Sequence, residues 1–176
     1  MKAHDSHRDA APKELGFHII TVSSSRYAKK ERKRRFRDES CDAAEKLVKN
    51  AGYRVRGRTL ISDDKEMLEE ALEKAMQDER VDVAVFTGGT GVAPRDLTVD
   101  VIRPHLEKEI EGFGELLRSI SYARIGAPAM LTRATAGLMS GKLVLCLPGS
   151  PDGVETALNL FMSDMAHVIY LARKKP

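Results

Sequence analysis

The chain has 176 residues, of which 42% are hydrophobic and 31% charged, and its formal net charge is +3. This length suits one globular domain and leaves too little chain for two. No apolar stretch approaches the roughly 20 residues that a membrane-spanning helix needs, and the N-terminus lacks an apolar signal segment. Cys41 and Cys146 lie far apart without metal-ligand spacing, so we expect a cytoplasmic protein without disulfides or a zinc site.

The first 14 residues are polar and cannot bury enough apolar surface to offset the entropy cost of ordering them. We therefore expect residues 1–14 to form a mobile tail. The folded α/β domain is then expected to span residues 15–176.

Strand-like and helix-like patterns alternate along this domain. Short apolar runs predict buried strands at residues 15–23, 53–61, 81–86 and 142–147. Apolar residues at helical spacing predict helices at residues 38–51, 67–76, 99–103, 113–125 and 150–169. Apolar strands separated by helices are typical of a parallel sheet that is covered on both sides. The sequence thus predicts a single doubly wound α/β domain, with a mostly parallel sheet and helices on both faces.

Three strands end in loops of unusual composition. They are SSSR at residues 23–26, TGGTGVAPRD at 87–96 and PGSPD at 148–152. Ligands of open α/β sheets bind beyond the carboxyl ends of the strands. We therefore expect the three loops to meet at one edge of the sheet and to form the binding site there.

The glycine-rich segment Thr87–Gly91 is the most distinctive of these loops. Three glycines permit positive φ angles and close backbone approach, so successive N–H groups can point into one concavity and bind an anion. The segment lacks the sequence of a Walker A loop and of a dinucleotide fingerprint. It is interpreted as a phosphate or carboxylate site of another kind. The alternative is a tight turn that needs glycine for its geometry alone.

Two acids, Asp63 and Asp96, follow predicted strands, and Arg95 precedes the second of them. Arginine makes forked contacts with phosphate, and a pair of carboxylates can hold a Mg²⁺ ion that bridges phosphate oxygens. Simpler alternatives remain open. Asp96 could cap a helix or pair with Arg95, and Asp63 with Glu66 has the spacing of a capping box.

A basic run at residues 26–37 holds eight lysines and arginines against one acid, Glu31. A nucleic-acid surface is one interpretation, but its only rings are Tyr27 and Phe36, so the interleaved aromatics of a base-stacking surface are missing. This composition argues against nucleic-acid binding. A solvated loop that attracts a small, multiply charged ligand fits better.

Five segments, in this order, carry a family resemblance: TVSSSR, LISDD, FTGGTGVAPRDLT, GFGELLRSIS and LPGSP. Together they resemble the family of molybdenum cofactor biosynthesis protein B and molybdopterin adenylyltransferase, over roughly residues 15–170. The resemblance implies the molybdopterin-binding fold and a homo-oligomer, either a trimer or a hexamer. It also implies transfer of AMP from ATP to molybdopterin with Mg²⁺ and release of pyrophosphate. A carrier or scaffold that binds molybdopterin without catalysis is the alternative.

The resemblance also implies roles for residues of this chain. Asp63 and Asp96 match the two acids associated with catalysis and would hold Mg²⁺ through ATP. Further residues are expected to bind substrate or phosphate, either from the family match or from the interpretation of the loops. They are Ser23, Ser24, Arg26, Thr87, Gly88, Gly89, Thr90, Gly91, Arg95, Glu115, Gly149, Ser150 and Pro151. The chain departs from the family pattern at Cys41, where glycine is usual, at Glu111, where some relatives have proline, and in its basic loop.

Overall fold

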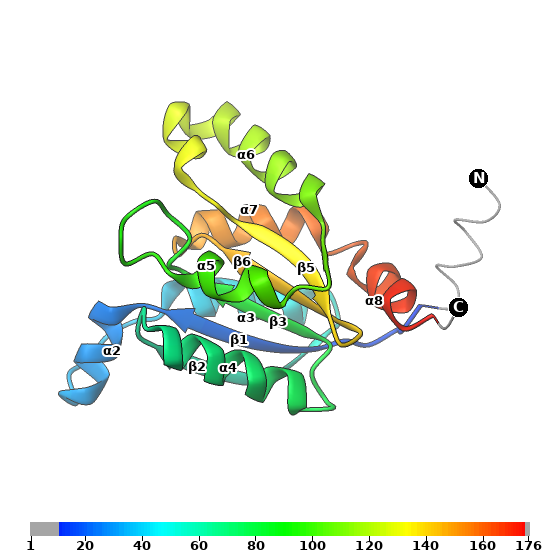
Figure 1. The fold of residues 1–176 in the computed structure, drawn as a ribbon, viewed down its shortest axis with the longest axis horizontal. Helices are drawn as coiled ribbons and strands as arrows, with labels where there is room; N and C mark the ends of the chain where they lie inside the picture. Colours follow the sequence, from blue (N-terminus) through cyan, green and yellow to red (C-terminus); the bar gives the residue numbers. More distant parts are fainter. Residues whose placement is uncertain (1–10, 175–176) are drawn as a thin grey trace.

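A six-stranded sheet forms the centre of the protein, in a computed structural model that describes residues 11–174. The strand order is β2-β1-β3-β6-β5-β4. The first four strands pair in parallel, whereas β5 pairs antiparallel with both of its neighbours, β6 and β4. The strands are β1 (Gly16–Val22), β2 (Arg54–Ile61), β3 (Val83–Thr87), β4 (Lys108–Glu109), β5 (Thr135–Met139) and β6 (Lys142–Leu147). Figure 1 shows this sheet with helices in front of it and behind it.

The helices connect the strands and cover both faces. The α-helices are α2 (Ser24–Glu31), α3 (Glu39–Asn50), α4 (Lys65–Gln77), α5 (Thr98–Ile102), α6 (Glu111–Ile125), α7 (Pro151–Phe161) and α8 (Met165–Arg173), and two short 3₁₀ helices are η1 (Arg103–His105) and η2 (Ala127–Leu131). Buried side chains of α3, α6, α7 and α8 pack on one face, and those of α4 and α5 pack on the other. The predicted fold, a mostly parallel sheet with helices on both faces, is confirmed.

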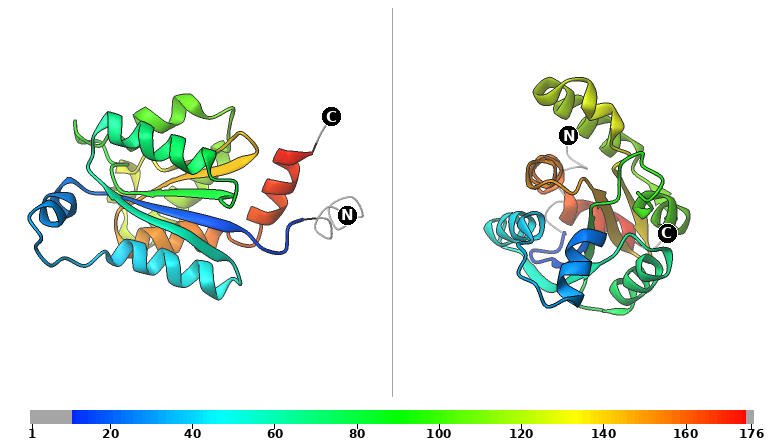
Figure 2. Two further views of the ribbon diagram at one scale, coloured as in Figure 1. Left: turned by 90° about the horizontal axis from the view of Figure 1, so that it is seen from below. Right: turned by 90° about the vertical axis from the view of Figure 1, so that its left-hand side faces the viewer.

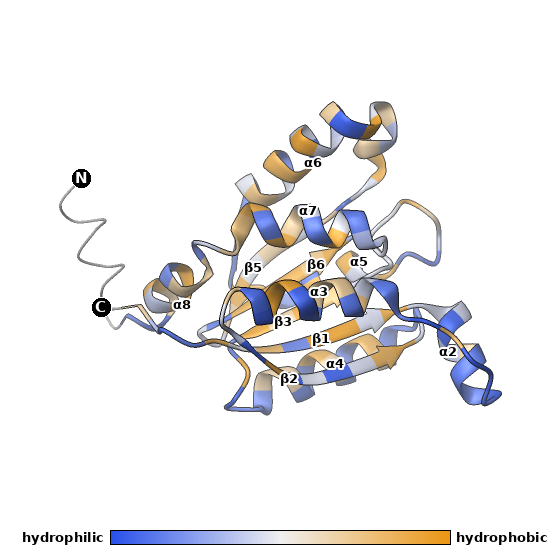
Figure 3. Cartoon of the chain, turned by 180° about the vertical axis from the view of Figure 1, so that it is seen from behind, coloured by the Kyte–Doolittle hydropathy of each residue, from blue (hydrophilic) through white to orange (hydrophobic). Residues whose placement is uncertain are grey.

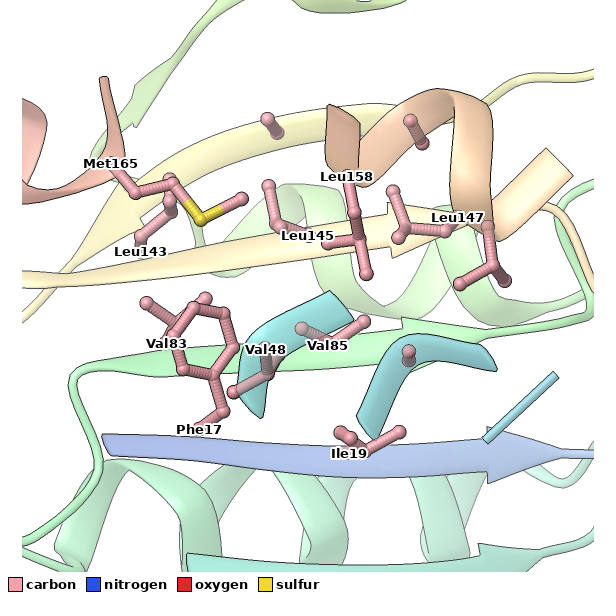
Figure 4. Close-up of a cluster of buried hydrophobic side chains, with 14 of the residues drawn as sticks. Phe17, Ile19, Val48, Val83, Val85, Leu143, Leu145, Leu147, Leu158 and Met165 are labelled. Carbon is pink, nitrogen blue, oxygen red and sulfur yellow. The ribbon is translucent and has the colours of Figure 1, made fainter. Parts of the chain in front are cut away.

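The strands send alternate side chains into the two cores, as strand geometry requires. In β1, Phe17 and Ile19 belong to the core beneath α3 and α7, whereas Ile20 and Val22 belong to the core beneath α4. Figure 4 shows the first of these cores, in which Val48 of α3 and Leu158 of α7 face the strands. Burial on both sides explains why these strands are almost wholly apolar.

Polar caps start three of the helices near the carboxyl ends of the strands. Asp38 accepts a hydrogen bond from the backbone N–H of Cys41 (3.3 Å), Asp64 from that of Met67 (3.0 Å), and Ser150 from that of Gly153 (3.1 Å). The capping box suggested for Asp63 is wrong, because the neighbouring Asp64 is the cap of α4. Asp63 is thereby left for another role.

Three parts of the fold differ from the sequence-based prediction. The basic run was expected to be a loop, but its first half forms α2, which begins at the cap residue Ser23 and has no buried residue. Neither β4 nor β5 was predicted, because β5 is short and contains Gly137, and both lie at the antiparallel edge. The predicted last helix is two helices. It is interrupted at residues 162–164, where Ser163 bonds Asp164 (2.7 Å), and such short polar side chains compete with helical hydrogen bonds.

Residues 1–10 of the expected mobile tail lie outside the described residues. Within the described range, no helix combines the length and hydrophobicity needed to cross a membrane. The hydropathy colouring in Figure 3 instead shows helices such as α3 and α7 with alternating hydrophilic and hydrophobic positions. This pattern is that of helices with one face on a protein core.

Candidate active site

The three loops that follow the parallel strands enclose one cavity of about 630 Å³. It lies at the sheet edge toward which the arrow of β1 points in Figure 1. Twelve of the residues singled out in the sequence line it: Ser23, Ser24, Arg26, Asp63, Gly88, Gly89, Thr90, Gly91, Arg95, Asp96, Gly149 and Ser150. The cavity is where the topology of an open α/β sheet puts a ligand site.

Three predicted site residues do not line this cavity. Thr87 is buried at the end of β3, where its hydroxyl donates to the carbonyl oxygen of Pro148 (2.9 Å) and so ties two of the loops together. Pro151 is the first residue of α7. Glu115 is exposed on α6 and is not part of the cavity wall.

Five further residues complete the wall: Val22, Ser25, Leu131, Thr132 and Pro148. Ser25 and Pro148 belong to loops that the sequence had already placed at this edge. Leu131 and Thr132 come from η2 and the segment after it, and no motif identified in the sequence pointed to them. They reach the cavity because the unpredicted strand β5 follows directly and pairs with β6.

Asp63 is fixed by the first turn of α2. Its Oδ2 accepts from the backbone N–H of Ser24 (3.3 Å) and from the Ser24 hydroxyl (3.2 Å). The same hydroxyl accepts from the Asp63 backbone N–H (3.1 Å) and from the Ser62 hydroxyl (2.9 Å). The Ser24 hydroxyl therefore donates its proton to Asp63, which makes Ser24 a positioning residue for this carboxylate.

The other carboxylate oxygen of Asp63, Oδ1, is buried and has no hydrogen-bond partner among the described residues. An unsatisfied buried carboxylate oxygen costs free energy, and such atoms recur at sites that bind a ligand or an ion. Asp63 is thus placed to accept from a ligand or to coordinate a cation.

The glycine-rich loop lies directly against both acids. Gly88 and Gly89 have φ angles of +109° and +63°, which L side chains rarely adopt. A Cβ at residue 89 would come within 2.5 Å of Asp63 Oδ1, and one at Gly91 within 2.6 Å of Asp96 Oδ2. Glycine is needed here for conformation and for close approach of the acids, which supports the tight-turn alternative, while the anion-binding interpretation stays a prediction.

Not every amide of this loop is free to bind an anion. The N–H of Gly88 donates to the carbonyl oxygen of Leu147 (3.0 Å). Within the described part of the chain, the N–H groups of Gly89, Thr90 and Gly91 have no hydrogen-bond partner. These three amides are the ones available to a phosphate or carboxylate group.

Asp96 closes a short turn and keeps its carboxylate at the cavity. Its Oδ2 accepts from the Ala93 backbone N–H (2.8 Å), and its own N–H donates to the Ala93 carbonyl oxygen (2.9 Å). Arg95, exposed in the same turn, also lines the cavity. The salt bridge suggested between Arg95 and Asp96 is not formed, so the guanidinium of Arg95 remains available to an anion.

The charges of the cavity wall balance, with Asp63 and Asp96 against Arg26 and Arg95. Arg26 is partly engaged, because its Nη1 donates to the Ser40 hydroxyl (3.3 Å) and lies 3.7 Å from Asp38. The cap residues Ser23 of α2 and Ser150 of α7 also line the cavity. Helix N-termini carry partial positive charge, so two of them favour an anionic ligand here.

The described residues supply neither a preformed metal centre nor a thiol at this wall. The described residues contain no group of three or more histidine, cysteine or acidic side chains placed to hold a metal ion. A cation held between Asp63 and Asp96 would need further oxygen ligands from the substrate. Among the lining residues there is no cysteine, and burial raises the pKa of the Cys41 thiol to about 11 and that of Cys146 to about 12.

A second cavity of about 360 Å³ adjoins the first, between α6, η2 and the start of α7. The two share Thr132, Pro148 and Ser150 as lining residues. Its wall includes Ile125, Pro128 and Ala129 and is more apolar than that of the first cavity. A polar cavity beside a more apolar one provides room for two ligands, or for one ligand with an anionic part and an organic part.

Comparison with known proteins agrees with this arrangement. The model of a family described as a probable molybdopterin binding domain matches residues 18–167. Molybdenum cofactor biosynthesis protein B of Bacillus cereus is 38% identical, over 93% of this chain and 94% of that protein. A molybdopterin adenylyltransferase of Pyrococcus furiosus is 37% identical, over 97% of this chain and 98% of that protein.

A solved structure of a related protein has a similar fold. The tungsten cofactor synthesizing protein MoaB from Pyrococcus furiosus matches with a TM-score of 0.82 and 36% identity, over 93% of this chain and 100% of that one. The sequence blocks and the fold thus indicate the same family. This chain belongs to the family of molybdenum cofactor biosynthesis protein B and molybdopterin adenylyltransferase, whose members share the probable molybdopterin-binding domain.

Proposed function

We propose that this protein is a molybdopterin adenylyltransferase, which transfers AMP from Mg-ATP to the terminal phosphate of molybdopterin. One observation carries the proposal: Asp63 and Asp96 contact the same glycine-rich loop, at Gly89 and Gly91, on the wall of one cavity. Two carboxylates beside unpaired amides suit a ligand that carries both phosphate groups and a divalent cation. The names of the relatives support the same activity.

In the proposed reaction, an oxygen of the molybdopterin phosphate attacks the α-phosphorus of ATP. A new phosphorus–oxygen bond forms, the bond to the β-phosphate oxygen breaks, and pyrophosphate leaves with the electron pair. The attacking phosphate is ionised near neutral pH, so no strong general base is needed. Catalysis then depends on positioning and charge stabilisation, which suits a wall without histidine or cysteine among its described residues.

Each part of the wall has a proposed task. The amides of Gly89, Thr90 and Gly91, with Arg95, hold phosphate groups. Asp63 and Asp96 orient the Mg²⁺ that accompanies the triphosphate, and Mg²⁺ would supply charge neutralisation at the phosphate oxygens. The buried, unpartnered Oδ1 of Asp63 supports this part of the proposal. The more apolar second cavity is proposed to hold the pterin part of the other substrate.

The test is incubation of the purified protein with molybdopterin, ATP and Mg²⁺. Adenylylated pterin, detected by mass spectrometry, and pyrophosphate are expected in equal amounts. Asp63→Asn is the control, because it removes the charge and keeps the shape of the side chain. Tight pterin binding without pyrophosphate release would instead select the alternative function, a carrier or scaffold.

We also propose that the protein acts as a cytoplasmic homo-oligomer, a trimer or a hexamer. Helix α6 and the adjoining η2 support this, because they expose six large apolar side chains: Leu116, Ile120, Tyr122, Ile125, Met130 and Leu131. Figure 1 shows α6 standing away from the sheet with one side uncovered. Large apolar side chains gathered on one exposed helix and its neighbour indicate an interaction site. Sedimentation equilibrium of the wild type and of Ile125→Asp would test the proposal, since the variant should be monomeric.

A further inference from the structure

Arg133 makes an unusual set of hydrogen bonds beside the cavity. Its Nε donates to the Gly91 carbonyl oxygen (2.7 Å), and its Nη2 donates to the Asp96 carbonyl oxygen (2.7 Å). Nη1 and Nη2 also donate to the two carboxylate oxygens of Asp100 (2.7 and 2.8 Å). The backbone N–H of Arg133 donates to the Thr90 carbonyl oxygen (2.8 Å). Main chain and side chain together therefore hold the segment from residue 90 to 100.

Two of these acceptors are the two ends of one exposed loop. Residues 92–95 are exposed, and the bonds between Ala93 and Asp96 are internal to the turn. The guanidinium joins the first residue of the loop, Gly91, to its last, Asp96. The loop carries the two charged groups that face the cavity on this side, Arg95 and Asp96. Arg133 therefore fixes the distance between the two ends of the loop, and with it the backbone that carries the Arg95 and Asp96 side chains.

Only arginine can make these bonds from a single side chain. The guanidinium is planar and has five N–H donors in a fixed fork, whereas the ammonium of lysine is a point charge on a flexible stem. Asp100, at the start of α5, takes the paired Nη donors and balances the charge. The Nε and the remaining Nη donor are then directed at the two loop carbonyl oxygens.

We propose that Arg133 is a positioning residue, which holds loop 91–96 so that Asp96 and Arg95 face the cavity. Arg133 is not among the lining residues, so it acts through the loop and not by touching the substrate. The part of this proposal that concerns reaction rate rests on the proposed function. The part that concerns the loop does not, and it can be measured without substrate.

The first measurement is hydrogen exchange, followed by mass spectrometry, in Arg133→Met and Arg133→Lys. Both variants should exchange the hydrogen-bonded amides of the loop, those of Ala93 and Asp96, about 10-fold faster than the wild type, with β1 and β3 unchanged. Arg173→Met is the matched control, because Arg173 also bonds a carbonyl oxygen, of Gly141 (3.1 Å), and a carboxylate, of Asp82 (2.6 Å). These two residues precede β6 and β3, at the opposite end of the strands from the cavity. Unchanged exchange of the Ala93 and Asp96 amides in Arg133→Met, or wild-type exchange of these amides in Arg133→Lys, would overturn the proposal.

The second measurement is a double-mutant cycle on the rate of AMP transfer. Arg133→Met should lower kcat about 10-fold in the wild type and by less than about 2-fold in Asp96→Asn, because Arg133 acts through the residue already removed. Equal effects in both backgrounds would mean that Arg133 only supports folding, which contradicts the proposal. If the wild type transfers no AMP, the proposed function fails, and hydrogen exchange alone decides the role of Arg133.

Discussion

Asp63 Oδ1 and the α-carbon of Gly89 are so close that a side chain at residue 89 has no room. A Cβ there would lie 2.5 Å from this oxygen and 2.4 Å from the hydroxyl oxygen of Thr98. The acid that follows β2 and the loop that follows β3 are thereby held in direct contact, although β1 lies between the two strands. The contact places a carboxylate beside backbone amides, which is the basis of the proposed nucleotide chemistry.

Gly89→Ala should therefore impair both stability and activity. The φ angle of +63° is strained for alanine by about 1–2 kcal/mol, and the new methyl group must displace Asp63 or Thr98. We expect AMP transfer to fall by about 10-fold or more, since Asp63 would move from its position. Urea unfolding and the pyrophosphate assay measure the two effects.

Gly112→Ala is the control for this substitution. Gly112 lies in the first turn of α6, and a Cβ there meets no atom within 4 Å. Alanine favours a helix over glycine by up to about 1 kcal/mol, so this variant should be as stable as the wild type or more so. Equal rates for Gly89→Ala and Gly112→Ala would show that the contact between Gly89 and Asp63 does not matter for the reaction.

Two adjacent acids should respond in opposite ways to substitution. Asp64 caps α4, so Asp64→Ala should cost about 1 kcal/mol of unfolding free energy and leave kcat unchanged. Asp63→Asn should lower kcat by about 10-fold or more and leave stability unchanged or increased, because it removes a buried charge with an unpartnered oxygen. Loss of stability in Asp63→Asn with normal kcat would assign Asp63 a structural role.

His18 should make stability depend on pH. Burial lowers its pKa from the ordinary value of 6.5, while Asp78 acts weakly in the opposite direction, and its Nε2 is 2.7 Å from the Thr59 hydroxyl oxygen. A lowered pKa means that the unfolded chain binds the proton first as pH falls. The stabilising contribution is therefore present above pH 6.5 and is lost as pH falls toward the folded-state pKa.

Urea unfolding between pH 8 and pH 5 measures this effect. The free energy of unfolding should decrease with falling pH in the wild type and less steeply in His18→Gln. His105→Asn, at an exposed position in η1, is the control and should retain the slope of the wild type. An identical slope in His18→Gln and the wild type would remove His18 as the cause.

The basic helix α2 should accelerate the capture of ATP. Figure 2 shows α2 (blue) projecting from the body of the protein, and its first turn lines the cavity. Lys29→Gln in α2, combined with Lys33→Gln just after it, should lower kcat/KM for ATP about 3-fold at low salt, with little change in kcat. The difference should vanish at 0.5 M salt, where the Debye length is about 4 Å. Lys46→Gln with Lys49→Gln, on α3, is the matched control.

Much of the fold and the site could be predicted because it depends on local patterns. Short apolar runs alternate with segments that have apolar residues at helical spacing, and this alternation predicts the parallel sheet and its helices. The reason is that burial on one face or on two determines which residues each element can use. Strand ends predict where loops meet, and twelve of the singled-out residues line one cavity for that reason. The same local signals also supported Asp63 as a helix cap, and there the pattern was misleading by one residue.

The remaining features depend on contacts between residues far apart in sequence. Ser24 orients Asp63 across 39 positions, and Arg133 bonds Gly91 across 42 positions. Strand β5 forms because β6 offers it a partner, and the edge strand β4 pairs in turn with β5. A periodic pattern indicates which face of a helix or strand is buried. It does not indicate which side chains from distant parts of the sequence pack against that face. Sequence therefore determined the class of fold and the edge of the sheet at which the cavity lies, whereas only the tertiary structure decided which polar groups are paired and which remain free.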